Sequence, residues 1–154
     1  MKQRIYIDTS VIGGCEDEEC SVWSIQLFEE FRRGLRIAVV SDLTRRELEG
    51  APESVKKILS SLPDTSLENV VLSEEAEALA RSYIDDGAVS ARHIADTQHI
   101  AIASVERVDV LVSLNFQQIV NLDRIRAFSS VNLKSGYPVL EIRSPREVSH
   151  EEKI

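Results

Sequence analysis

Polar side chains follow three of the strands that this sequence predicts. Asp8 comes directly after the apolar strand expected at residues 4–7, and Glu47 lies in a short helix after the second strand. Ser113 and Asn115 lie at the end of the fourth strand. Parallel sheets bind ligands at the carboxyl ends of their strands, near the point where the strand order reverses. These residues therefore indicate a polar site at one edge of a sheet.

A further carboxylate lies on a predicted helix instead of a strand end. Asp96 is part of the segment SARHIADTQHIAIASVE, residues 90–106, in which most of the helix circumference is apolar. With the 3.6-residue period of a helix, Asp96 shares its stripe with Ile100 and Ala103. A carboxylate in such surroundings has to be paired or bound to a metal, and Arg92, one turn earlier, is the pairing partner within the helix.

The elements that must position these residues alternate between strand and helix. Apolar runs predict strands at residues 4–7, 36–41, 68–73, 108–113 and 138–144. Amphipathic segments predict helices at residues 20–33, 44–50, 74–84, 90–106 and 122–135, with a further helix from Pro52. The alternation predicts an α/β fold of three layers, α/β/α, with a central parallel sheet of four to five strands.

Length, charge and cysteine content narrow the class of protein. A chain of 154 residues is expected to form a single domain, here residues 1–147, with a polar C-terminal tail at 148–154. The net charge of −8 argues against broad electrostatic binding of nucleic acid, so action on RNA would need bound cations and a local basic rim. Cys15 and Cys20 are expected to be free thiols. Without an apolar leader or a run long enough to span a membrane, the protein is expected in the cytoplasm.

At these polar residues the sequence resembles the PIN domain, the metal-dependent ribonuclease fold of the VapC-type toxins. The similarity covers residues 4 to about 147, and four motifs carry it in the family's order: Asp8 with Thr9 and Ser10, Glu47 in LTRRELEGAP, Asp96 in HIADTQHIAIA, and LVSLNF running into QQIVN. By position, Asp8, Glu47 and Asp96 match the first three acids of the family. Asn115 stands in the place of a fourth acid, which is usually Asp.

The resemblance implies a cluster of acids that holds Mg²⁺ or Mn²⁺ and an endoribonuclease, a hydrolase of RNA phosphodiester bonds. Asp8, Glu47 and Asp96 would be its metal ligands. The amide of Asn115 would bind a metal or orient a water, but it adds no negative charge. One ion would then be held tightly, and a second would arrive with the substrate phosphate.

The groups around the acids take their roles from the same resemblance. Thr9, Ser10 and Ser113 would orient carboxylates or waters, and Arg45, Arg46 and Arg92 would form a basic rim for RNA. Toxins of the family pair with a small antitoxin and often form homodimers. Besides an RNA substrate, an antitoxin and a second copy of the chain are therefore the expected partners.

Most of these residues also have a purely structural explanation. A strand-ending acid such as Asp8 is commonly a turn former or the N-cap of a helix. Glu47, in a segment rich in charge, fits a solvated helix residue. Asn115 with Gln118 three residues later matches a capping box, and scattered arginines are ordinary surface. The residue types therefore leave both the chemical and the structural interpretation open at each position.

One other class of enzyme fits these residues less well, and one alternative is a protein without enzymatic activity. A phosphatase of the aspartyl-phosphate kind needs a second acid two residues after Asp8, where this chain has Ser10. His93 and His99 are interpreted as packing or hydrogen-bonding residues. The main alternative is a PIN-like scaffold that has lost enough charge, through Asn115, to serve as a binding or interaction module.

Overall fold

A single parallel sheet forms the centre of the computed structural model, which describes residues 2–16 and 21–152. In the described segments its strands are β1 (Arg4–Ile7), β2 (Ile37–Ser41), β3 (Leu67–Val70), β4 (Val110–Val112) and β5 (Ile142–Arg143). They are hydrogen-bonded in the order β3-β2-β1-β4-β5, and every pair is parallel. The chain builds outward from β1 to β3, then returns to the other side of β1 for β4 and β5.

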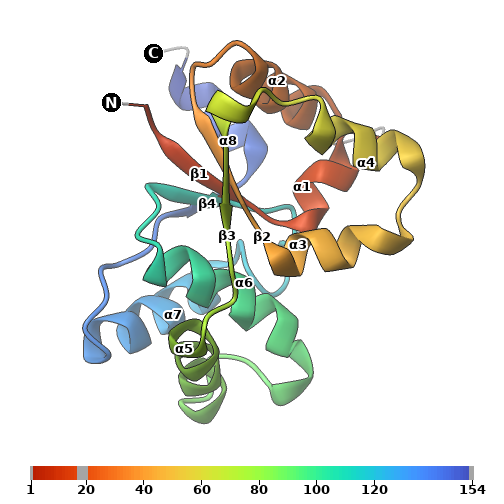
Figure 1. Ribbon diagram of the computed structural model, residues 1–154. Helices are drawn as coiled ribbons and strands as arrows, with labels where there is room; N and C mark the ends of the chain where they lie inside the picture. Colours follow the sequence, from red (N-terminus) through yellow and green to blue (C-terminus); the bar gives the residue numbers. More distant parts are fainter. Residues whose placement is uncertain (1, 17–20, 153–154) are drawn as a thin grey trace.

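Helices cover both faces of this sheet (Figure 1). On one face lie α5 (Glu74–Asp85), α6 (Ile94–Val105) and α7 (Leu122–Lys134); on the other lie α1 (Thr9–Gly14), α2 (Ser21–Arg32), α4 (Glu53–Ser60) and α8 (Pro145–Glu152). A short helix, α3 (Asp42–Glu47), follows β2, and 3-10 turns occupy Leu48–Gly50, Asp64–Ser66 and Ala91–His93. The predicted three-layer α/β/α fold with a parallel central sheet is confirmed.

Alternation along the strands explains why both faces are apolar. Tyr6 packs into the cluster under α5, α6 and α7, whereas its neighbours Ile5 and Ile7 pack into the cluster under α1, α2, α4 and α8. All three side chains are fully buried. Successive strand residues point to opposite faces, so a strand that is covered on both sides is a continuous apolar run.

Several elements differ from the sequence predictions. Helix α1 was not expected, because the six-residue segment TSVIGG is too short to show helical periodicity and ends on two glycines. Helix α8 continues past residue 147, and Val148 packs into the core beneath α2, so the domain boundary drawn there falls inside a helix. Strand β5 is much shorter than the run predicted at 138–144. Cys15 is a free thiol, and Cys20 lies outside the described residues.

None of the helices in the described segments has the length and apolar character that a membrane span requires.

Gly14 allows α1 to approach the loop that follows β4. A Cβ atom at Gly14 would lie 2.5 Å from Leu114 Cδ1 and 2.8 Å from Ser24 Oγ, whereas a Cβ at Gly13 would meet nothing within 4 Å. Both substitutions by alanine gain helix propensity, but only the one at Gly14 forces its neighbours to move. We expect Gly14→Ala to be less stable than Gly13→Ala by on the order of 1 kcal/mol. Urea denaturation of both variants measures the difference, and equal free energies of unfolding would contradict this close approach.

Candidate functional site

The candidate site lies where the strand order reverses. Strands β1 and β4 are neighbours, although β2 and β3 come between them in the chain. Asp8 directly follows β1, and Ser113 directly follows β4. The first turn of α6 adds Asp96, and the last residue of α3 adds Glu47. This is the position at which open parallel sheets bind ligands.

Asp8 is buried and held on both carboxylate oxygens. Its Oδ1 accepts hydrogen bonds from Ser10 Oγ at 2.5 Å and from the Val11 backbone N–H at 3.3 Å, and its Oδ2 accepts from Ser113 Oγ at 2.5 Å. Burial raises the pKa of Asp8 above its ordinary value, against the opposing effects of His99 and the two hydroxyls. Asp8 is therefore the N-cap of α1 and a buried acid of the site at once.

Two serine hydroxyls join Asp8 to the loop after β4. Ser10 Oγ accepts a hydrogen bond from the Leu114 backbone N–H at 2.9 Å, and Ser113 Oγ accepts one from the Asn115 backbone N–H at 3.0 Å. Each hydroxyl then donates its own proton to Asp8. The ends of β1 and β4 are thereby fixed relative to one another, and the orientation of the Asp8 carboxylate is fixed with them.

Glu47 is partly exposed and anchored through one oxygen. Its Oε1 accepts hydrogen bonds from Thr9 Oγ1 at 2.5 Å and from His99 Nε2 at 2.8 Å. Burial acts to raise the pKa of Glu47, but the hydrogen bonds from His99 and Thr9 outweigh it, so the pKa lies below its ordinary value. Glu47 is thus ionised at neutral pH.

Asp96 faces Asn115 and His93. Its Oδ1 accepts a hydrogen bond from Asn115 Nδ2 at 3.3 Å, and its Oδ2 lies 3.6 Å from His93 Nδ1. Arg92, the alternative partner within the helix, donates to His93 instead. Burial is the main cause that raises the pKa of Asp96, and the nearby negative charge of Glu47 adds to it.

Asn115 presents its amide nitrogen to the acids. Its Oδ1 accepts a hydrogen bond from the Gln118 backbone N–H at 3.0 Å, which leaves Nδ2 to donate to Asp96. The contact with Gln118 has the form of a helix cap, but the reciprocal bond of a capping box is absent, because the Asn115 N–H donates to Ser113. In this orientation Asn115 donates to Asp96 and stabilises its ionised form.

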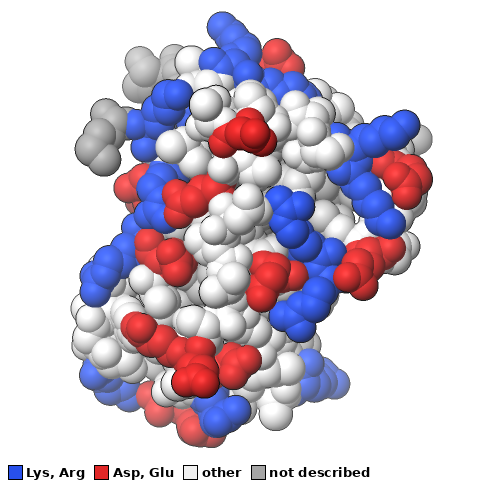
Figure 2. All heavy atoms as spheres, viewed as in Figure 1, with Lys and Arg blue, Asp and Glu red and all other residues white. Residues whose placement is uncertain are grey.

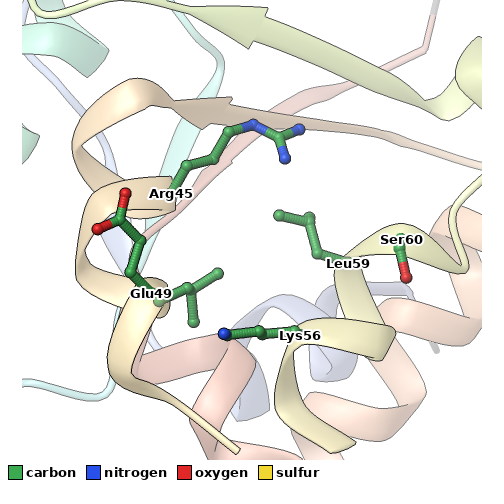
Figure 3. Close-up of a pocket in the computed structure, with 6 residues that line it drawn as sticks. Arg45, Glu49, Lys56, Leu59 and Ser60 are labelled. Atoms are coloured by element: carbon green, nitrogen blue, oxygen red, sulfur yellow. The ribbon is translucent and has the colours of Figure 1, made fainter. Parts of the chain in front are cut away.

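The three predicted basic residues are exposed, and two of them have a contact near the acids. Arg46 lies near enough to Glu47 to lower its pKa, and Arg92 adjoins the His93 that contacts Asp96. Arg45 donates to Asn69 Oδ1 and borders a hollow between α3 and α4, with Lys56 on its opposite side (Figure 3). Figure 2 shows Lys and Arg interspersed with Asp and Glu on the face that it presents.

His99 is the site residue that the sequence did not identify as such. It is 3% exposed and lies between Glu47 and Tyr6, whose hydroxyl is 2.6 Å from His99 Nδ1. A signal did exist in the sequence, since His99 follows Asp96 by one helical turn within an apolar segment. That spacing alone does not distinguish a site residue from a histidine satisfied within the core.

The donor set suits a hard divalent cation. Asp8, Glu47 and Asp96 offer carboxylate oxygens, the ligands that Mg²⁺ and Mn²⁺ prefer. The described part of the chain gives none of these three acids an ion pair with Lys or Arg. Nor do the described residues bring three Asp, Glu, His or Cys side chains close enough to enclose an ion directly. Mg²⁺ typically keeps several waters and is held by one or two carboxylates, so an ion held here by fewer than three of these side chains would remain partly hydrated.

The fold is that of the PIN domain, as solved structures of VapC-type toxins and their complexes show. A chain of VapBC2 from Rickettsia felis matches with a TM-score of 0.60 and 13% identity, over 92% of this chain and 98% of that one. VapC20 from Mycobacterium tuberculosis, a toxin that cleaves the sarcin–ricin loop, matches with a TM-score of 0.56 and 12% identity over 89% and 98%. A chain of DNA-bound VapBC from Salmonella typhimurium gives 0.56 and 17% over 94% and 99%. No family model and no curated protein sequence matches the chain.

Proposed function

We propose that this protein is a metal-dependent endoribonuclease that hydrolyses RNA phosphodiester bonds with Mg²⁺ or Mn²⁺. The observation that carries the proposal is the gathering of Asp8, Glu47 and Asp96 at the switch point of the sheet, without an ion-paired Lys or Arg among the described residues. The fold adds support, because VapC20, which shares it, cleaves an RNA loop.

Each acid of the site, and the hydroxyls beside Asp8, would have a separate role in the reaction. Asp8 and Asp96 would hold the ion, which, when bound, lowers the pKa of a water and stabilises developing negative charge. Ser10 and Ser113 keep the Asp8 carboxylate oriented. Glu47, ionised and partly exposed, would hold a further ligand water or accept a proton from the attacking one.

Few positively charged side chains would contribute to the binding of RNA. Arg46 and Arg92 flank the acids, and Arg45 and Lys56 border the neighbouring hollow (Figure 3). Each phosphate that a Lys or Arg neutralises adds about one unit to the slope of log affinity against log salt. A shallow salt dependence is therefore expected, and selectivity would come from the shape of the RNA.

An antitoxin partner follows from the same structural similarity. The related solved structures include VapBC complexes from two bacteria and FitAcB from Neisseria gonorrhoeae. By this similarity the chain would be the toxin of a toxin–antitoxin pair, with the antitoxin covering the acids, and would form a homodimer.

Asn115 favours a second candidate function, that of a catalytically weakened scaffold. Its amide donates to Asp96 at the position where the PIN domain usually has an acid. The site then carries less charge with which to hold a metal, and the protein would act by binding RNA or another protein.

Incubation of the purified protein with a mixed pool of structured and single-stranded RNA tests the proposal. We expect cleavage with Mn²⁺ and none with chelator, because hydrolysis needs the ion. Calorimetric titration with Mn²⁺ accompanies the assay. Protein that binds Mn²⁺ and RNA but cleaves nothing in the pool would overturn the nuclease proposal in favour of the scaffold.

A further inference from the structure

We propose that His99 is a positioning residue for Glu47, which it holds by an Nε2–H hydrogen bond while Tyr6 fixes its ring from the opposite side. The part of this inference that concerns cleavage rests on the proposed function. The hydrogen bond itself is a property of the chain without metal, and it is tested separately.

His99 is placed between β1 and the end of α3. It lies in α6 and is almost completely buried, with Nε2 2.8 Å from Glu47 Oε1 and Nδ1 2.6 Å from the Tyr6 hydroxyl. Tyr6 is a fully buried residue of β1, and its ring meets the imidazole edge-on, with centroids 5.7 Å apart. The histidine therefore links the end of α3 to the centre of the sheet.

The chemistry of the partners fixes which atom donates. An ionised carboxylate only accepts, so Nε2 must carry the proton that it shares with Glu47. In the neutral imidazole, Nδ1 then accepts the proton of the Tyr6 hydroxyl. Burial raises the pKa of Tyr6, so that this proton is retained. The tautomer of His99 is thus set by Glu47, and the buried Tyr6 hydroxyl is compatible with it as the donor to Nδ1.

The chain of hydrogen bonds closes on the helix that carries Glu47. The Tyr6 oxygen lies 2.8 Å from Ser41 Oγ, which accepts from the Thr44 backbone N–H at 3.2 Å as the N-cap of α3. Glu47 is the last residue of the same helix. One end of α3 is thereby capped, and the other is tied by His99 to the same tyrosine.

The anchoring leaves one carboxylate oxygen available. Thr9 and His99 both donate to Oε1 of Glu47, and no described residue donates to Oε2. A carboxylate held through one oxygen can present the other to a metal or to water in a fixed direction. Groups that orient metal-binding side chains in this way typically account for 10–100-fold in metal affinity or activity.

The first test needs no metal. Nitrogen-15 NMR of the histidine side chains, recorded near neutral pH in chelator, reports which ring nitrogens carry protons, and loss of the signals in His99→Gln assigns them. We expect Nε2 of His99 to be protonated. A neutral ring with its proton on Nδ1 would overturn the proposal.

The second test compares two substitutions at the same position. His99→Leu removes the donor, whereas His99→Gln retains an N–H donor at about the place of Nε2. Titration with Mn²⁺ alone should show affinity roughly 10–100-fold weaker for His99→Leu, with much of it restored in His99→Gln. Affinity of His99→Leu equal to that of the unaltered protein would overturn the proposal.

Tyr6→Phe keeps the test decisive if His99→Leu does not fold, because it removes one hydroxyl and leaves the ring in place. We expect kcat for RNA cleavage to fall while KM stays nearly constant, since Tyr6 is buried and touches no RNA. An unchanged kcat would contradict the role of Tyr6.

If the unaltered protein neither binds Mn²⁺ nor cleaves RNA, the proposed function fails, and the NMR measurement alone decides the positioning of Glu47.

Discussion

Asp96→Asn is expected to abolish metal-dependent cleavage of RNA without disturbing the fold. The amide has the same shape as the carboxylate, and its oxygen can still accept the hydrogen bond from Asn115. It supplies no negative charge for the cation, however. The loss of activity should exceed the roughly 10–100-fold that is typical of residues acting only through a ligand. Cleavage rates at saturating Mn²⁺ measure it.

The same substitution should stabilise the metal-free protein at neutral pH. Because the pKa of Asp96 is raised in the folded state, the ionised carboxylate favours unfolding. In the unaltered protein the free energy of unfolding falls as the pH rises toward that raised pKa, because the folded state holds the Asp96 proton more tightly than the unfolded state does. Asp96→Asn has no proton to lose at this position and avoids that fall. The gain should vanish at a pH below 3.8, the ordinary pKa of an aspartate, where Asp96 is protonated in both states. Thermal unfolding in chelator at neutral and acidic pH tests the sign.

Asp85→Asn is the matched control for both measurements. Asp85 is an exposed residue at the end of α5, so its substitution should change neither cleavage nor the pH dependence of stability beyond about 0.5 kcal/mol. If Asp96→Asn unfolds at neutral pH, Asp96 is structural. If it still cleaves with Mn²⁺, Asp96 is not a ligand that the reaction needs.

The layered fold was predictable because its determinants are local. Each strand that is covered on both faces is a continuous apolar run, and each long helix shows its own period, with Ser73 as the cap before α5. The placement of Asp8 and Ser113 at the same edge of the sheet also followed, because both lie at the carboxyl ends of parallel strands, but the pairing of β1 with β4 is known only from the structure. Helix α1 is the opposite case, since its six residues are stabilised by the Asp8 cap and by packing against α2.

The details of the site depend on contacts between distant residues, and the sequence does not encode these as a pattern. The cap and site interpretations of Asp8 do not exclude one another, because Oδ1 caps α1 through the Val11 N–H and Oδ2 accepts from Ser113 at the end of β4. His99 meets Tyr6 across 93 positions of the chain. The amide orientation of Asn115 is decided by the Gln118 backbone. The residue type limits which hydrogen bonds each of these side chains can make. The fold decides which partner atom each donor or acceptor contacts.

Asn115→Asp is expected to tighten Mn²⁺ binding by about 10-fold or more, because it completes the set of acids with a second charge beside Asp96. The new carboxylate can still accept the hydrogen bond from Gln118, but it can no longer donate to Asp96. Two like charges then face one another in the metal-free protein. We expect the free energy of unfolding without metal to fall by about 1–3 kcal/mol at neutral pH.

Calorimetric titration with Mn²⁺ and thermal unfolding with and without Mn²⁺ measure the two effects. Asn121→Asp serves as control, since Asn121 caps α7 by accepting from the Asp123 and Arg124 N–H groups and aspartate is an equally good cap. Unchanged Mn²⁺ affinity in Asn115→Asp would mean that position 115 does not face the ion.

The cleavage assay then separates the two candidate functions. A nuclease should already cleave RNA with Asn115 in place, whereas a weakened scaffold should gain cleavage only when the fourth acid is restored.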